Sequence, residues 1–207
     1  MTLKMPHEHP DTIICGIDEV GRGPLAGPVF AAAVILAPHF DVSVLKDSKV
    51  LSEKKRIDIA QDIFATCLWG IGAASVSEID TYNILQASLL AMERAYTSLL
   101  KKISHSNIDP TRIFSLVDGN KEPNIPHCKA YIKADATFPE VMAASILAKV
   151  SRDKLMCQYA KRFPQYGYEK HKGYCTKQHL HAIYTLGESP IQRKTFSYPK
   201  QKPHTTS

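Results

Sequence analysis

Two periodicities of apolar residues divide the chain into predicted strands and helices. Short apolar stretches rich in β-branched residues predict buried strands over 12–18, 28–36, 68–75 and 113–117. Apolar residues at helical spacing predict helices over 52–67, 84–103 and 138–162. Tyr131 and Ile132 form a short extended stretch before the last helix, and short helices and loops are expected after it. This order predicts an α/β fold with helices flanking one sheet, and three early strands joined by short breaks favour a mixed sheet.

The composition is that of an ordinary globular protein, and it excludes several classes of protein. The chain has 207 residues, of which 44% are hydrophobic and 22% are charged, so it is not disordered, collagen-like or a disulfide scaffold. Its longest apolar run, over 29–37, is far shorter than the ~20 residues that cross a bilayer. The opening segment MTLKMPHEHPDT lacks the apolar stretch of a signal peptide. We therefore expect a cytoplasmic protein that does not bind membranes.

Positive charge is concentrated in the last part of the chain. From Lys149 onward, 12 lysines and arginines face three acidic residues, for a net +9, which leaves −3 for the first 148 residues. The same part is rich in aromatic residues, which can stack on sugars or bases while the cations contact phosphates. This pattern is compatible with nucleic-acid binding, and equally with a solvated helix face above core aromatics.

Acidic residues follow the predicted buried strands. Asp18 and its neighbour Glu19 come after ICGI, Asp118 comes after FSLV, and Asp135 comes after AYIKA. The carboxyl ends of strands are where open α/β sheets present ligand-binding groups. If the strands are neighbours, the four carboxylates converge, and a hard cation such as Mg²⁺ or Mn²⁺ would relieve their repulsion. Two such ions can hydrolyse a phosphodiester.

Simpler interpretations of these acidic residues stay open at this point. Asp18 can be a turn residue, Asp118 can form an Asx turn and Asp135 can cap a helix. Glu19 can join Asp18 only if the strand ends or twists there, because adjacent strand residues point to opposite faces.

Six blocks of sequence carry a resemblance to a known family. In order, they are GIDEVGRGPLAGPV (16–29), LKDSKVLSEKKR (45–56), VDGN (117–120), KADATFPEVMAASILAKVSRD (133–153), HKGYCTKQH (171–179) and SPIQRKTF (189–196). Together they resemble the motifs of ribonuclease HII, the type 2 ribonuclease H, over roughly residues 12–197. The resemblance implies an RNase H-like fold: a mixed five-stranded sheet flanked by helices, with a C-terminal helical extension.

The resemblance also implies an activity. Members of this family cleave the RNA strand of RNA/DNA hybrids and nick duplex DNA on the 5′ side of an embedded ribonucleotide, leaving 3′-hydroxyl and 5′-phosphate ends. This places the chain in ribonucleotide excision repair and DNA replication. The alternatives are a module that binds hybrids without cutting them and a metal-dependent DNA nuclease of the same fold.

Roles carry over from the family to individual residues, and all of them are implied by the resemblance. The catalytic metal ligands would be Asp18, Glu19, Asp118 and Asp135. The substrate-binding residues would be Gly21, Arg22 and Gly23 at the ribose, Tyr174 at the RNA–DNA junction and Lys49 at a phosphate. The chain would contain an N-terminal arm (1–11), a catalytic domain (12–197) and a disordered polar tail (198–207). We expect a monomer, and the tail contains no identifiable peptide for a replication clamp.

Two further sets of residues are less decisive. Ser145 and Lys149 can serve either the helix core or the substrate. The histidines His171, His179 and His181 lie among basic residues and are not expected to bind zinc.

Overall fold

A mixed sheet of five strands forms the centre of the molecule. The computed structural model describes residues 11–45, 51–106 and 108–199. The sheet order is β3-β2-β1-β4-β5, with bounds β1 (Ile13–Val20), β2 (Val29–Ile35), β3 (Leu68–Ala74), β4 (Ile113–Asp118) and β5 (Cys128–Tyr131). β2 runs antiparallel to both β1 and β3, whereas β4 is parallel to β1 and to β5. The predicted mixed five-stranded α/β fold is therefore confirmed.

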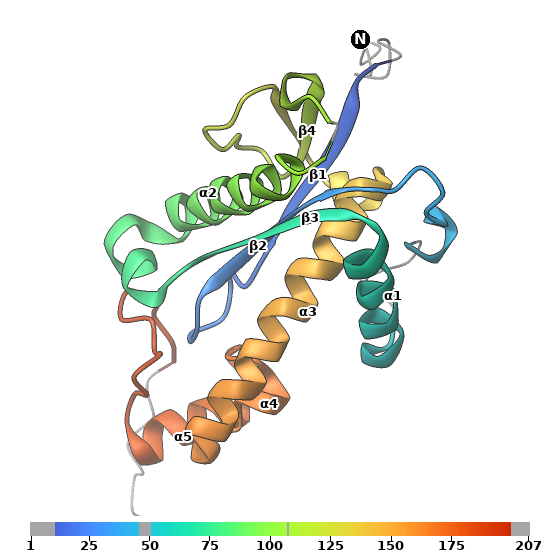
Figure 1. Ribbon diagram of the computed structural model, residues 1–207. Coiled ribbons are helices and arrows are strands. Elements are labelled where there is room, and N and C mark those ends of the chain that lie inside the picture. Colours follow the sequence, from blue (N-terminus) through green and yellow to red (C-terminus); the bar gives the residue numbers. More distant parts are fainter. Residues whose placement is uncertain (1–10, 46–50, 107, 200–207) are drawn as a thin grey trace, which may run out of the picture.

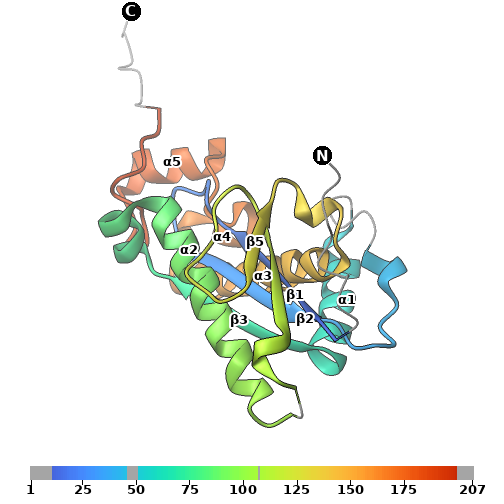
Figure 2. The ribbon, with the colours of Figure 1, turned by 90° about the horizontal axis from the view of Figure 1, so that it is seen from above.

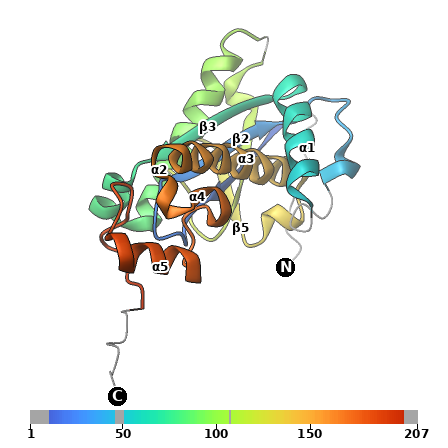
Figure 3. The same cartoon turned by 90° about the horizontal axis from the view of Figure 1, so that it is seen from below.

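Helices cover both faces of the sheet. The helix α2 (Val76–Ile103) packs on one face, and α1 (Glu53–Thr66) and α3 (Pro139–Arg162) pack on the other (Figures 1 and 2). Two short helices follow α3 in the chain, α4 (Tyr168–His171), which packs against the C-terminal half of α3, and α5 (Lys177–Leu186), and together they form the C-terminal extension (Figure 3). Short 3₁₀ turns occupy Val42–Leu45, Pro110–Arg112, Ala134–Ala136 and Pro164–Tyr166. None of the helices in the described ranges is long and apolar enough to cross a bilayer.

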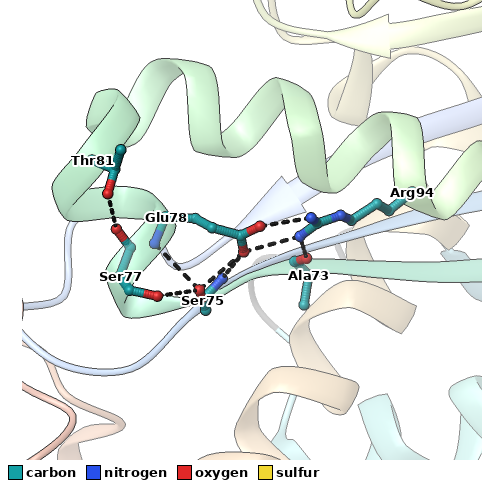
Figure 4. A network of polar contacts seen from close by, with 6 residues as sticks. All are labelled: Ala73, Ser75, Ser77, Glu78, Thr81 and Arg94. Atoms are coloured by element: carbon teal, nitrogen blue, oxygen red, sulfur yellow. Dashed lines mark hydrogen bonds and ion pairs between the residues drawn. The ribbon is translucent and has the colours of Figure 1, made fainter.

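The helix α2 begins earlier than the apolar spacing predicts. It starts at Val76, although Asn83 (φ 69°) interrupts it, and the predicted start at Ile84 is the start of its second segment. Ser75 and Glu78 form a capping box at the first segment, and Arg94 holds the Glu78 carboxylate with Nη2–Oε1 at 2.6 Å (Figure 4). The signal for this earlier start was the S-x-x-E spacing, because the first segment has too few apolar residues to show a helical period.

The helix α3 approaches β1 very closely. A Cβ at Gly16 would lie 2.0 Å from the carbonyl carbon of Glu140 in the first turn of α3, so only glycine fits there. This contact brings the first half of α3 against the middle of β1. Asp18 follows Gly16 by two residues on the same face of the strand, so it also points toward α3.

The ends of the predicted domain lie at the limits of the described residues. Asp11 is the part of the expected N-terminal arm that the structure describes, and Tyr198 and Pro199 are the corresponding part of the expected tail. The Tyr198 hydroxyl donates to Glu188 at 2.9 Å, and the Tyr184 hydroxyl donates to the Pro199 carbonyl. The domain limits themselves stay a prediction.

Candidate active site

The register of the parallel pair β1–β4 places two aspartates side by side. Ile17 pairs with Val117, so the next residue of each strand, Asp18 and Asp118, is an aspartate. Asp135 comes from the 3₁₀ turn after β5, and its backbone N–H lies 3.5 Å from Asp118 Oδ1. The carboxylate oxygens of the three residues lie within 4.8 Å of one another. The structure therefore gathers these three acidic side chains from three separate parts of the chain.

Burial makes this cluster electrostatically costly. Asp18 is 5% exposed, and its pKa is raised well above the usual range, first by desolvation and then by the charges of Glu19 and Asp118. Hydrogen bonds from the Ser145 hydroxyl and the Glu19 backbone N–H oppose that rise. Three oxygen donors this close, without histidine or cysteine, fit a hard divalent cation, which would remove the repulsion between them.

Glu19 lies beside this cluster and is not one of its three members. β1 continues through Val20 by pairing with β2, so Glu19 lies within the strand, and its charge acts on Asp18. One of its oxygens pairs with Arg22 Nη1 at 3.2 Å, and the other is buried with no hydrogen-bond partner among the described residues. Desolvation raises the pKa of Glu19, and Arg22 lowers it. Its role as a fourth metal ligand stays a prediction.

A buried arginine holds the loop that follows β1. Arg193 is fully buried, and its guanidinium donates to the carbonyls of Gly27, Arg22 and Gly21 at 2.8, 2.9 and 2.5 Å. All peptide bonds in the described residues are trans, so each N–H points away from the carbonyl of its own peptide unit. Because the carbonyls of Gly21 and Arg22 point inward, the next two N–H groups, those of Arg22 and Gly23, point outward.

A second buried arginine supports the same loop from the side of α3. Arg152, on α3, donates to the carbonyls of Pro28, Lys172 and Ala26 at 3.0, 2.9 and 3.1 Å. Gly21 has φ +96°, and a Cβ there would lie 2.3 Å from Arg152 Nε. The first glycine of GRG is therefore required both by its backbone conformation and by the space that the arginine fills.

Neither arginine was predicted from the sequence as part of the site. Both lie in blocks that carry the family resemblance, but an arginine is rarely buried without a carboxylate partner, so residue type alone predicts an exposed position. The three carbonyl acceptors of each guanidinium become visible only in the folded chain.

Tyr174 lies next to this loop. It follows α4 and is 39% exposed, and its Cε1 would lie 3.9 Å from a Cβ built on Gly23. The Leu25 N–H donates to the Gly173 carbonyl at 2.9 Å, which ties the tyrosine segment to the loop. The predicted Tyr174 and GRG positions are therefore neighbours in space. Lys49 lies outside the described residues.

Comparisons with known proteins agree with this geometry. The family model for ribonuclease HII matches residues 15–198. Ribonuclease HII of Treponema denticola is 56% identical over 196 residues, which cover 89% of this chain and 98% of that protein. In the solved PCNA:RNase HII complex from Archaeoglobus fulgidus, the matching chain is 23% identical with a TM-score of 0.71, covering 92% of this chain and 98% of that one. Bst-RNase HIII in complex with Mn²⁺ is 20% identical with a TM-score of 0.66, covering 87% of this chain and 65% of that one.

Proposed function

The chain belongs to the ribonuclease HII family and is an endoribonuclease of the ribonuclease H type, and from this premise we propose how its site selects and cuts a substrate. The substrates are RNA/DNA hybrids, cut in the RNA strand, and duplex DNA, nicked on the 5′ side of an embedded ribonucleotide. The observation that supports this proposal most strongly is the cluster of three carboxylates from β1, β4 and the turn after β5, next to an exposed glycine loop that follows β1 directly.

The acidic cluster is the proposed metal site. Asp18, Asp118 and Asp135, with Glu19 beside them, would hold Mg²⁺ or Mn²⁺, and a structural neighbour is described with Mn²⁺. Two such ions would supply an activated water and would stabilise the leaving oxygen, so that 3′-hydroxyl and 5′-phosphate ends result. The chain itself contributes the alignment of these carboxylates, which the β1–β4 register sets before substrate arrives.

The loop after β1 is the proposed reader of the ribose. A 2′-hydroxyl distinguishes RNA from DNA and is both a donor and an acceptor. The outward N–H groups of Arg22 and Gly23 offer donors to it, and the missing side chains at Gly21 and Gly23 allow the sugar to come close to the backbone. Tyr174, beside Gly23, would pack at the RNA–DNA junction. Lys49 is retained as a proposed phosphate contact.

The basic C-terminal part would hold the duplex backbone. Its net +9 over Lys149 to the end gives salt-dependent binding, since cations released from the phosphates favour the complex at low salt. We assign this activity to ribonucleotide excision repair and DNA replication in the cytoplasm, carried out by a monomer.

A cleavage assay on duplex DNA with one ribonucleotide tests this function. We expect a nick on the 5′ side of the ribonucleotide with Mg²⁺ or Mn²⁺, and none with EDTA or with an all-DNA duplex. Equal cutting of the all-DNA duplex would keep the metal site and remove the ribose role of the glycine loop. Binding without any cut in either metal would instead identify a hybrid-binding module.

A further inference from the structure

Two buried histidines stack on each other next to Tyr174. His171 ends α4 and His179 lies in the first turn of α5, and their ring centroids are 4.5 Å apart with an angle of 16° between the planes. His171 is 8% exposed and His179 is fully buried. Neither ring belongs to the acidic cluster, and their burial keeps both rings away from direct contact with a duplex.

Hydrogen bonds define which nitrogen of each ring carries a proton. Gly173 N–H donates to His171 Nδ1 at 3.2 Å, so the proton of His171 is on Nε2, which lies 2.8 Å from the Tyr166 carbonyl. His179 Nδ1 lies 3.0 Å from the Tyr174 carbonyl and must carry the proton, because a carbonyl only accepts. His179 Nε2 is buried without a hydrogen-bond partner among the described residues. Both rings are therefore held in the neutral form.

These bonds hold the backbone on both sides of the Tyr174 α-carbon. His171 accepts from the N–H of the preceding residue, Gly173, and His179 donates to the Tyr174 carbonyl. The Thr176 N–H also donates to that carbonyl at 2.8 Å, so the carbonyl accepts two hydrogen bonds and the one from the histidine further fixes its orientation. With the Leu25–Gly173 hydrogen bond, the pair sets the position of the Tyr174 ring relative to Gly23.

We propose that His171 and His179 are positioning residues, which fix Tyr174 against the glycine loop so that its ring meets the RNA–DNA junction. This inference rests on the proposed role of Tyr174. The pair acts only while both rings are neutral: a proton on His171 Nδ1 would face the Gly173 N–H, and a proton on His179 Nε2 would be buried without an acceptor among the described residues.

The groups around the pair act on its titration in both directions. Burial lowers the pKa of His171, with Lys172 acting the same way and Glu169 opposing it. Burial and the neighbouring His171 together lower the pKa of His179 to about 4, against the opposing effect of the backbone at Tyr174 and Gly173. Tyr168 contacts both rings edge-on and its hydroxyl is bonded to Ser189. From α3, Arg152 bonds the Lys172 carbonyl and Cys157 contacts the Lys172 ammonium.

A double-mutant cycle tests the proposal. The variants are His179→Phe, which keeps a ring without a donor, and His179→Asn, which keeps an N–H near the position of Nδ1, each with and without Tyr174→Ala. The quantity is kcat/KM for duplex DNA with one ribonucleotide divided by kcat/KM for a uniform RNA/DNA hybrid. We expect His179→Phe to lower this ratio about fivefold, the value of one neutral hydrogen bond. His179→Asn should restore most of it, and neither should act in the Tyr174→Ala background.

The outcomes distinguish a failure of the proposed junction role of Tyr174 from a failure of the proposed positioning role of the histidines. If Tyr174→Ala leaves the ratio unchanged, the proposed junction role of Tyr174 is wrong. If Tyr174→Ala lowers the ratio but His179→Phe does not, or lowers it equally in both backgrounds, the positioning role is overturned.

A second measurement covers the case in which His179→Phe does not fold. In the wild-type protein, the same ratio should fall as the pH drops from 6.5 through about 4, where His179 gains its proton, and it should stay flat in Tyr174→Ala. Titration of the carboxylates cancels in the ratio, because both substrates use them. A ratio independent of pH in the wild type would contradict the proposal.

Discussion

The acidic cluster and the glycine loop are neighbours, but they differ in how their buried charges are stabilised. The carboxylates of the cluster repel one another, whereas the guanidiniums that support the loop are paired with backbone carbonyls. The cluster gathers three carboxylates, and burial, followed by the charges of Glu19 and Asp118, raises the pKa of the most buried one, Asp18. The loop rests on the guanidiniums of Arg152 and Arg193, each of which is buried and donates to three backbone carbonyls. The uncompensated negative charge of the carboxylates attracts a cation from solution. The positive charge of each guanidinium is instead stabilised by backbone carbonyls, and these hydrogen bonds hold the loop in place. The first region is therefore suited to chemistry and the second to selection.

Loss of one carboxylate should have the largest effect on cleavage. We expect Asp118→Asn to lower kcat at least a hundredfold, because it removes charge where the transition state needs stabilised metal ions. Folding and substrate binding should persist, since Asn is isosteric and the loop is untouched. Cleavage rates in Mg²⁺ measure this, with the exposed Asp62→Asn as a matched control. A normal rate for Asp118→Asn would refute the metal-site assignment.

Loss of a buried arginine that supports the glycine loop should mainly lower the free energy of unfolding and the preference for ribonucleotides over all-DNA duplex. Arg193→Gln leaves up to three buried carbonyls without their donor, and we expect unfolding to become easier by roughly 3 kcal/mol. Urea denaturation gives this free energy, and the ratio of cutting at a ribonucleotide to cutting of all-DNA duplex gives selection, which should fall. Arg112→Gln is the matched control, since its side chain is 46% exposed and lies outside the site. Equal stability of the two variants would show that Arg193 is not part of a scaffold.

The smallest expected effect concerns the metal-free protein. The pKa of Asp18 is raised in the folded state, so its contribution to stability is fully present below its ordinary pKa and is lost as the pH rises through the raised value. Asp18→Asn should therefore be more stable than the wild type at pH 8 in EDTA, by at least about 1 kcal/mol. The difference should vanish near pH 3.5.

Metal ions should reverse this difference. Saturating Mg²⁺ binds the folded wild type and raises its melting temperature, but it should leave Asp18→Asn nearly unchanged. Melting curves at pH 8 with and without Mg²⁺ measure both parts of the prediction. A wild type more stable than Asp18→Asn in EDTA would show that burial and the neighbouring charges do not raise the pKa of Asp18.

Four of the five strands and two of the helices could be predicted from the sequence to within two residues, whereas β5 overlaps the predicted extended stretch only at Tyr131. Periodicity located β2 and β3 within one residue at each end, because both are buried and bounded by turns. It missed two features that depend on pairing and on caps. β1 extends past Asp18 because β2 pairs with Glu19 and Val20, and α2 starts at its capping box ahead of its apolar stripe.

Some residues of the site could likewise be predicted from the apolar pattern, and others could not. Asp18 and Asp118 were predictable because each ends an apolar stretch, and the parallel register then makes them neighbours. The different environment of Glu19 depends on how far β1 continues, which spacing does not show. The roles of Arg152 and Arg193 were hidden, because their partners are carbonyl groups that every residue carries. Hydrogen bonds from an arginine to carbonyls far away in the sequence leave no trace in residue type.

The dependence of the loop on Arg193 has a consequence for synthesis of the protein. A ribosome that has translated the chain as far as α5 has already made all three aspartates and the strands that align them. It has not yet made the guanidinium that turns the GRG carbonyls inward. Translation thus produces every residue of the acidic cluster before it produces the arginine that supports the glycine loop.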